Sequence, residues 1–145
     1  MIKLMTARQY LNRCRALKMN VDKLLERKER MLAQAIYSSP SFSGNNNNNS
    51  THSNESKIQN ITDKMLQIDS IIEMFQRERQ KALKNMMCIK DVKVRQVLIK
   101  FYYDCCSYAQ ITKDIGISKS TVRRKLKEGV AEMKNIIKPI DNEPG

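Results

Sequence analysis

The stretch Ser107–Val130 reads SYAQITKDIGISKSTVRRKLKEGV, and its pattern decides the fold of the C-terminal part of the chain. Ile111 and Ile115 are four residues apart, so they share one face of a first helix. Gly116 follows at a position where a helix end favours a residue that adopts positive φ. Ser118 is then a suitable N-cap for a second helix. The pattern predicts a helix-turn-helix, in which the second helix enters the major groove of DNA.

The second helix of this pair is strongly basic. Its inner face carries Val122 and Leu126. The segment from residue 119 to residue 127 contains no acidic residue, and its basic residues are Lys119, Arg123, Arg124, Lys125 and Lys127. Since arginine can bond both acceptors of a guanine edge, we expect Arg123 and Arg124 to read bases, with a smaller contribution from Ser120. We expect Lys113, Lys119 and Lys127 to meet phosphates. The alternative is an ordinary helical hairpin with a solvated basic face.

Residues from about Val94 to Met133 resemble region 4 of the sigma-70 class of bacterial transcription factors. They are also similar to small phage and prophage proteins that carry this region behind an N-terminal coiled coil. The resemblance implies a DNA-binding regulator, of the kind that acts on late genes, and a contact with RNA polymerase. It rests on Val97-Leu98, Phe101-Tyr102-Tyr103-Asp104, Ser107-Tyr108, Ile111, Gly116-Ile117-Ser118 and Thr121-Val122-Arg123.

The chain departs from the family pattern at three places. Thr112 stands where alanine is usual, and we expect its hydroxyl to bond back to a carbonyl of its own helix. Cys105-Cys106 stand where a glycine is common, and we interpret them as small packing residues in a tight corner. Gly129 stands where alanine is common.

Charge and hydropathy restrict the partners. The net charge is +12 and the pI is about 9.7, which favours a polyanionic partner such as double-stranded DNA. No apolar run approaches the 18 residues of a membrane span. The first ten residues, MIKLMTARQY, lack the apolar core of a signal peptide. We therefore expect no membrane contact and a place in the cytoplasm of a bacterial host cell.

The sequence offers no pattern for chemistry. The 4 cysteines form no C-x-x-C pair and the chain has 1 histidine, so we expect no metal site and no cofactor. Disulfides are not expected in a chain of this intracellular type. We find no nucleophile, base or carboxylate constellation, which argues against a recombinase or another enzyme that acts on DNA.

Two apolar seams step by three and four residues through the first part of the chain, and such heptad patterns are typical of coiled coils. Each seam carries one basic residue, Lys28 or Arg79, which we interpret as setting register or snorkelling. The first seam is Ala7, Tyr10, Cys14, Leu17, Val21, Leu24, Lys28, Met31 and Ala35. The second is Ile58, Ile61, Met65, Ile68, Ile72, Phe75, Arg79, Ala82 and Met86.

A polar stretch, residues 38–56, separates the seams and contains little that a core could bury, so we expect a flexible linker. A parallel pair would require this linker to span nearly the whole helix length, whereas an antiparallel hairpin requires only about 10 Å. The sequence therefore favours an antiparallel hairpin. The alternative is that the seams pair with another copy and form a homodimer.

The complete expectation is an all-α chain with a long antiparallel helical hairpin, a coiled coil, ahead of a helix-turn-helix domain. We place the hairpin at residues 1–88, the DNA-binding domain at 89–138 and a frayed tail at 139–145. Asp91 is the expected N-cap of the helix that completes the DNA-binding core, and Pro139 the expected stop of the last helix. The favoured function is transcription regulation, and the alternative is a DNA-packaging protein of the small-terminase type or an architectural DNA-binding protein.

Overall fold

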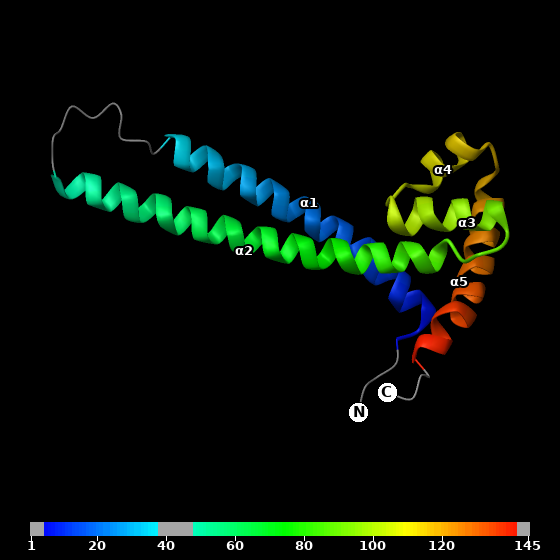
Figure 1. Cartoon of the computed structure of the whole chain (residues 1–145). Helices are drawn as coiled ribbons and strands as arrows, with labels where there is room; N and C mark the ends of the chain where they lie inside the picture. Colours follow the sequence, from blue (N-terminus) through cyan, green and yellow to red (C-terminus); the bar gives the residue numbers. More distant parts are fainter. Residues whose placement is uncertain (1–4, 38–47, 142–145) are drawn as a thin grey trace. The chain divides into compact units, whose positions relative to one another are not determined.

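The structure is a computed structural model that describes residues 5–37 and 48–141, with side chains described for residues 5–37 and 55–137. Within these ranges every regular element is helical, which confirms the all-α prediction (Figure 1). The elements are α1 (Ala7–Tyr37), α2 (Asn48–Met86), α3 (Val92–Leu98), the π-helical turn η1 (Ile99–Tyr103), α4 (Tyr108–Ile115) and α5 (Lys119–Asp141).

The chain divides into two compact units. We call Asn20–Met74 the hairpin unit, and Met1–Met19 together with Phe75–Gly145 the core unit. Helices α1 and α2 therefore contribute residues to both units. The domain boundaries at 88/89 and 138/139 stay a prediction.

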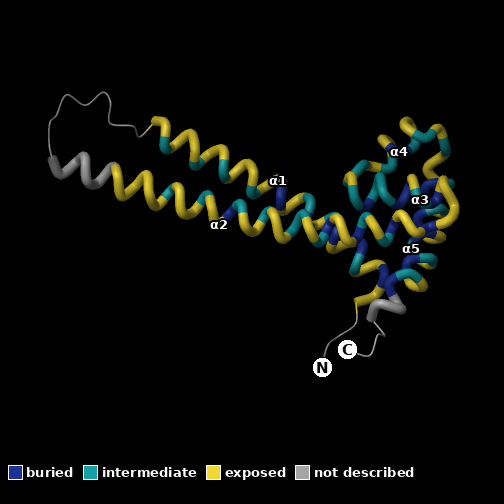
Figure 2. Tube along the Cα trace, in the orientation of Figure 1, coloured by how far each residue is buried: buried dark blue, intermediate teal, exposed yellow. Residues whose placement is uncertain are grey.

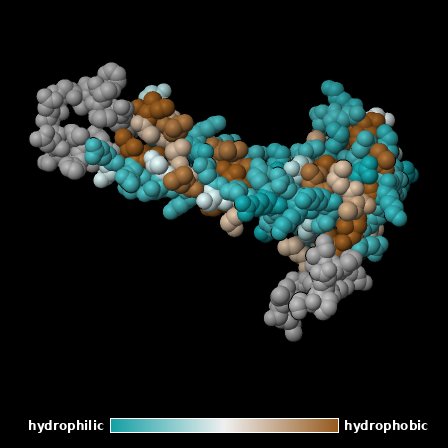
Figure 3. Space-filling model, viewed as in Figure 1, coloured by the Kyte–Doolittle hydropathy of each residue, from teal (hydrophilic) through white to brown (hydrophobic). Residues whose placement is uncertain are grey.

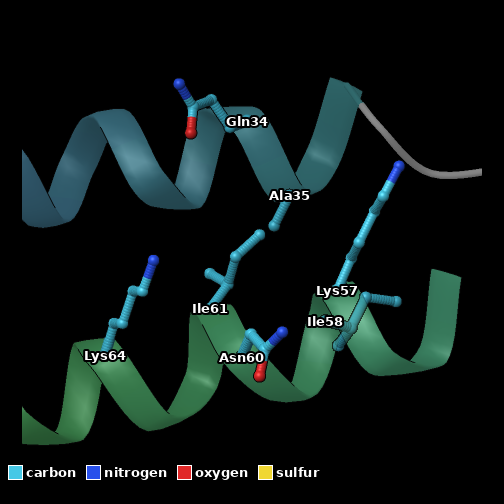
Figure 4. Close-up of a pocket in the computed structure, with 7 residues that line it drawn as sticks. All are labelled: Gln34, Ala35, Lys57, Ile58, Asn60, Ile61 and Lys64. Carbon is cyan, nitrogen blue, oxygen red and sulfur yellow. The ribbon is translucent and has the colours of Figure 1, made fainter. Parts of the chain in front are cut away.

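In the hairpin unit, α1 and α2 run antiparallel, as predicted. Lys28 of α1 forms an ion pair with Asp69 of α2, with 2.7 Å between Nζ and Oδ1. Farther along α1, Ala35 faces Ile61 near the start of α2 (Figure 4). Later residues of α1 thus lie beside earlier residues of α2. The supercoiling that would define a coiled coil stays a prediction.

The predicted seams agree closely with burial. Every member of the first seam is buried or half-buried, and so is every member of the second except Ile58, which is exposed. Burial is uneven along the hairpin, however. In the described part of the hairpin unit, only Val21 and Ile68 are fully buried.

The expected linker at residues 38–56 is too long at its C-terminal end, because α2 is already helical from Asn48. Asparagine, serine and threonine are only moderately poor helix formers. Extending a helix that already exists requires no new nucleus, so the apolar seam that follows can support these residues. The remaining part of the expected linker, residues 38–47, lies outside the described residues.

The core unit is built around an apolar cluster (Figure 2). The first turns of α1 and the last turns of α2 contribute to this cluster together with α3, α4 and α5. Leu11, Met86 and Ile89 are almost fully buried there, alongside Val94 and Leu98 of α3. Leu11 was not part of the predicted seam. It is buried because it faces this cluster.

The two basic seam residues behave differently. Lys28 is half-buried and reaches Asp69, whereas Arg79 is only 6% exposed and does not snorkel. The Arg79 guanidinium lies over the Tyr103 ring, 4.1 Å from its centroid, and Nη2 donates to the Tyr103 carbonyl oxygen at 2.5 Å. Nη1 donates to Gln76 Oε1 at 3.0 Å. Arg79 therefore joins α2 to the end of η1.

Two further expectations concern helix ends. Asp91 caps α3 as predicted, because its carboxylate accepts hydrogen bonds from the backbone N–H groups of Val94 and Lys93. These bonds lower the pKa of Asp91.

The expected stop at Pro139 is wrong by two residues, since α5 continues to Asp141. A proline removes its own N–H donor and its ring crowds the carbonyl group four residues earlier, which can kink a helix without ending it. Helix ends also commonly vary by one or two residues. Residues 142–145 of the expected tail lie outside the described residues.

Candidate nucleic-acid interface

The turn between α4 and α5 has the predicted local geometry. Gly116 adopts φ 76° and ψ 38°, in the left-handed region, and its N–H donates to the Thr112 carbonyl oxygen at 2.8 Å. Ser118 Oγ then accepts a hydrogen bond from the Thr121 N–H at 3.2 Å and so caps α5. The Thr112 hydroxyl bonds back to the Ala109 carbonyl oxygen at 2.7 Å, as expected from its position.

The inner faces of α4 and α5 hold the turn against the core. Ile111 and Val122 are fully buried and Leu126 is 6% exposed, while Ile115 and Ile117 are half-buried beside the same cluster. Because these five side chains lie on one side of the helix pair, the opposite side of α5 remains available to a ligand.

Helix α5 also approaches α3 closely at Gly129. A Cβ atom at this position would lie 2.8 Å from Leu98 Cδ1 and 3.3 Å from Val94 Cγ1. These distances are shorter than ordinary van der Waals contacts. The glycine, noted in the sequence as a departure from the usual alanine, therefore permits the packing of α5 on α3.

All six predicted DNA-binding residues are exposed. Five of the six lie in the first three turns of α5, and Lys113 lies on α4. Apart from Ser120 all are cationic, and within the described ranges none of these cationic side chains forms an ion pair with a carboxylate. The acidic residue of α4, Asp114, is itself engaged by Lys100 at 3.3 Å and by Gln110 at 2.9 Å. The six exposed residues are Lys113, Lys119, Ser120, Arg123, Arg124 and Lys127.

Two members of this set have structural neighbours. Ser120 Oγ lies 3.1 Å from Ser118 Oγ, so its hydroxyl shares the cap of α5. The Arg123 guanidinium lies 5.9 Å from the centroid of the Tyr108 ring. Lys125, the remaining basic residue of this segment, is half-buried and faces the other way, where its charge contributes to the lowered pKa of Asp91.

Behind Arg123 lies a stack of aromatic and cationic groups that sequence reasoning did not find. Phe101 of η1 stacks on Tyr108 of α4, with ring centroids 5.3 Å apart and an interplanar angle of 8°. The Arg15 guanidinium of α1 covers the Phe101 ring at 4.2 Å. These residues come from four elements, and no local spacing signals their contact.

The tight corner between η1 and α4 is formed by the two adjacent cysteines. Cys105 is the only non-glycine residue with positive φ among those described, at 59°, where such a conformation strains most side chains. Its Sγ lies 3.5 Å from the Arg15 carbonyl oxygen, and the Cys106 N–H donates to the Lys100 carbonyl oxygen at 2.9 Å. Both residues are half-buried, in agreement with a packing role.

Charge is distributed very unevenly between the two units. The sequence of the core unit contains 21 basic and eight acidic residues, a net charge of +13. The hairpin unit contains six basic and seven acidic residues, a net charge of −1. The electrostatic attraction for a polyanion therefore arises in the core unit, which contains the helix-turn-helix.

Two other kinds of site are absent from the described part of the chain. No group of three or more histidine, cysteine, aspartate or glutamate side chains could hold a metal ion among the residues that the structure describes. In the same residues, no helix is both long and apolar enough for a membrane span.

Comparison with known proteins identifies a family for the C-terminal part of the chain. No curated protein and no solved structure matches the chain. The family model for sigma-70, region 4, matches residues 91–133, which include Asp91, helices α3 and α4, η1 and the first part of α5. Residues 91–133 therefore form a helix-turn-helix domain of the sigma-70 region 4 type.

Proposed function

We propose that the protein is a sequence-specific DNA-binding regulator of transcription. The observation that carries this proposal is the exposed basic side of α5 on a region 4-like helix-turn-helix whose opposite side is packed in the core. The inner face of α5 is packed in the core, and the first turns of such a helix lie deepest in the major groove. The +13 charge of the core unit supplies the attraction to phosphates.

Contacts with phosphates and bases have separate roles in this proposal. Lys113, Lys119 and Lys127 bind phosphates, which orients the domain on the duplex without selecting a sequence. Arg123 and Arg124 read base edges, and each bonds O6 and N7 of a guanine in the manner that favours arginine over lysine. The hydroxyl of Ser120 contributes less, because it already shares the cap of α5.

The test begins with genome-wide mapping of the bound DNA and continues with a salt titration on the mapped site and on a scrambled duplex. Arg123→Ala and Arg124→Ala should each weaken specific binding by about 1–3 kcal/mol and relax preference at one base pair. Lys127→Ala should weaken binding to both duplexes alike and reduce the salt slope by about one unit.

The matched control is Lys134→Ala, which removes another exposed lysine of α5, two turns beyond Lys127. Its affinity for the mapped site should stay close to that of the unchanged protein. A uniform loss on both duplexes for the two arginine variants would contradict their role in base reading. Equal affinity of the unchanged protein for the mapped and the scrambled duplex would contradict sequence-specific binding itself.

The genomic position of the site tests the regulatory role. Binding upstream of one operon supports transcription regulation, whereas binding at a DNA-packaging site favours the small-terminase alternative. The resemblance to region 4 proteins of phages and prophages supports a phage or prophage origin, action in the cytoplasm of the bacterial host and a contact with RNA polymerase. Co-purification of host polymerase with the protein on promoter DNA tests that contact.

A further inference from the structure

The hairpin unit has few fully buried side chains for two helices of this length. Isolated helices depend on tertiary packing for most of their stability, yet only Val21 and Ile68 are fully buried among its described residues. Apolar surface extends along the hairpin in Figure 3. Eight large apolar side chains of the unit are exposed, namely Leu25, Leu32, Ile36, Tyr37, Ile58, Leu66, Ile71 and Met74.

Five of these side chains lie on one side of the hairpin. Leu25, Leu32 and Ile36 are spaced by seven and four residues, so they share a face of α1. The ion pair between Lys28 and Asp69 locates this face, because Lys28 is three residues after Leu25 and four before Leu32.

On α2, Leu66 precedes Asp69 by three residues and Ile58 precedes it by eleven, which is about three turns. Both therefore lie on the side of the ion pair. We call Leu25, Leu32, Ile36, Ile58 and Leu66 the apolar face.

The charges of the hairpin unit favour another copy of the same unit as the occupant. Residues 20–37 of α1 carry four basic and three acidic side chains, whereas residues 48–74 of α2 carry two basic and four acidic ones. A two-fold axis along the hairpin places α1 of each copy against α2 of the other, so the positive helix meets the negative one twice. A unit with a net charge of −1 has little self-repulsion, and it has no excess positive charge to attract DNA.

We propose that the apolar face binds the apolar face of a second copy of this chain, so that the two hairpin units form a four-helix bundle. The 18 residues of α1 in the unit make a helix about 27 Å long. Two helices about 10 Å apart then offer roughly 500–600 Å² per copy. This area lies at the lower end of specific interfaces, so we expect dimer and monomer to exchange at micromolar concentrations.

One consequence concerns DNA and rests on the proposed function. With the two-fold axis along the hairpin, residues 20 and 74 of both copies lie at the same end of the bundle. Both core units are therefore joined to that end, and the dimer is suited to a site with two half-sites. Binding of one half-site raises the effective concentration of the second core unit near the other.

The test is sedimentation velocity of the full chain over a range of concentrations, at high salt and free of nucleic acid. The unchanged protein should shift from monomer to dimer as its concentration rises. Leu32→Glu and Leu66→Glu place a carboxylate in the interface and should leave a monomer. These side chains are 50% and 60% exposed in one copy, so the helices should form in both variants, which circular dichroism verifies.

The matched control is Met74→Glu. Met74 is 65% exposed on the same helix as Leu66 but follows Asp69 by five residues, which turns it away from the apolar face. This variant should dimerise like the unchanged protein. Three results would overturn the proposal. The unchanged protein could stay monomeric over the whole concentration range, or it could form a ring of more than two copies. The Leu66 and Met74 variants could also dissociate equally. None of these outcomes depends on DNA binding, so the proposed function is tested separately.

Discussion

Replacing Gly129 with alanine isolates the contact that holds α5 against α3. The added Cβ would lie 2.8 Å from Leu98 Cδ1, with Val94 Cγ1 at 3.3 Å. Leu98 and Val94 are 0% and 1% exposed, so neither side chain can turn into solvent to make room. The substitution must therefore move α5, repack α3 or force Leu98 out of its preferred rotamer.

Two opposing effects decide the magnitude. Alanine in place of glycine in a helix interior stabilises the helix by about 1 kcal/mol. Overpacking of a closed core costs about 1–3 kcal/mol. The difference predicts a net loss of about 0–2 kcal/mol. For a chain of this length each kcal/mol of that loss lowers Tm by about 2–4 °C.

The assay is thermal and urea unfolding followed by helix content, in a double-mutant cycle with Leu98→Val. Valine lacks both Cδ atoms, so Gly129→Ala should become neutral or stabilising in that background. Gly116→Ala is the control. Its Cβ would meet nothing within 4 Å, and it should cost about 1–2 kcal/mol in both backgrounds because φ is +76°. Stabilisation of the otherwise unchanged protein by Gly129→Ala would refute the packing argument.

Three further predictions concern side chains in the core unit. Tyr108→Leu removes the ring that positions Arg123 and should reduce the affinity for specific DNA about two- to five-fold. Tyr108→Phe keeps the ring and should keep that affinity. Equal losses on specific and scrambled duplexes would contradict the role of Tyr108 in positioning Arg123. The pKa of Asp91 is lowered by the N–H groups it caps, so this carboxylate stabilises the fold above the ordinary aspartate pKa, near 3.8, and loses that effect as pH falls through the lowered folded value. Asp91→Asn should therefore flatten the stability profile below about pH 4, measured by unfolding at each pH. Burial raises the pKa of Cys14 to about 11. A thiol reagent at neutral pH should therefore label the exposed Cys88 quickly and the buried Cys14 only on unfolding. Equal labelling rates of the two thiols would contradict the burial of Cys14.

Local chemistry made the turn and the caps readable from the sequence. Gly116, Ser118 and Asp91 were each assigned from preferences that act over three or four residues, and the structure has the expected hydrogen bonds at all three. The seams were readable because burial follows helical periodicity along one element. The exposure of the predicted DNA-binding residues followed from the same periodicity, since Val122 and Leu126 fix the inner face of α5.

Contacts between distant elements were decided only by the tertiary structure. The stack that joins Arg15, Phe101, Tyr108 and Arg123 depends on how α1, η1, α4 and α5 pack, and no spacing in the chain encodes it. The burial of Arg79 likewise depends on a carbonyl group supplied by Tyr103, 24 residues away.

The same distinction explains why the helix ends differ from their predicted positions and why the contact at Gly129 has no local sequence signal. The start of α2 at Asn48 and the continuation of α5 to Asp141 depend on support from the rest of each helix, which outweighs weak local preferences. Gly129 was visible as a departure from alanine, but its reason is the Leu98 side chain on another helix. Propensity and capping act within one helical turn, whereas packing depends on the three-dimensional neighbours of each residue, and those exist only after the chain has folded.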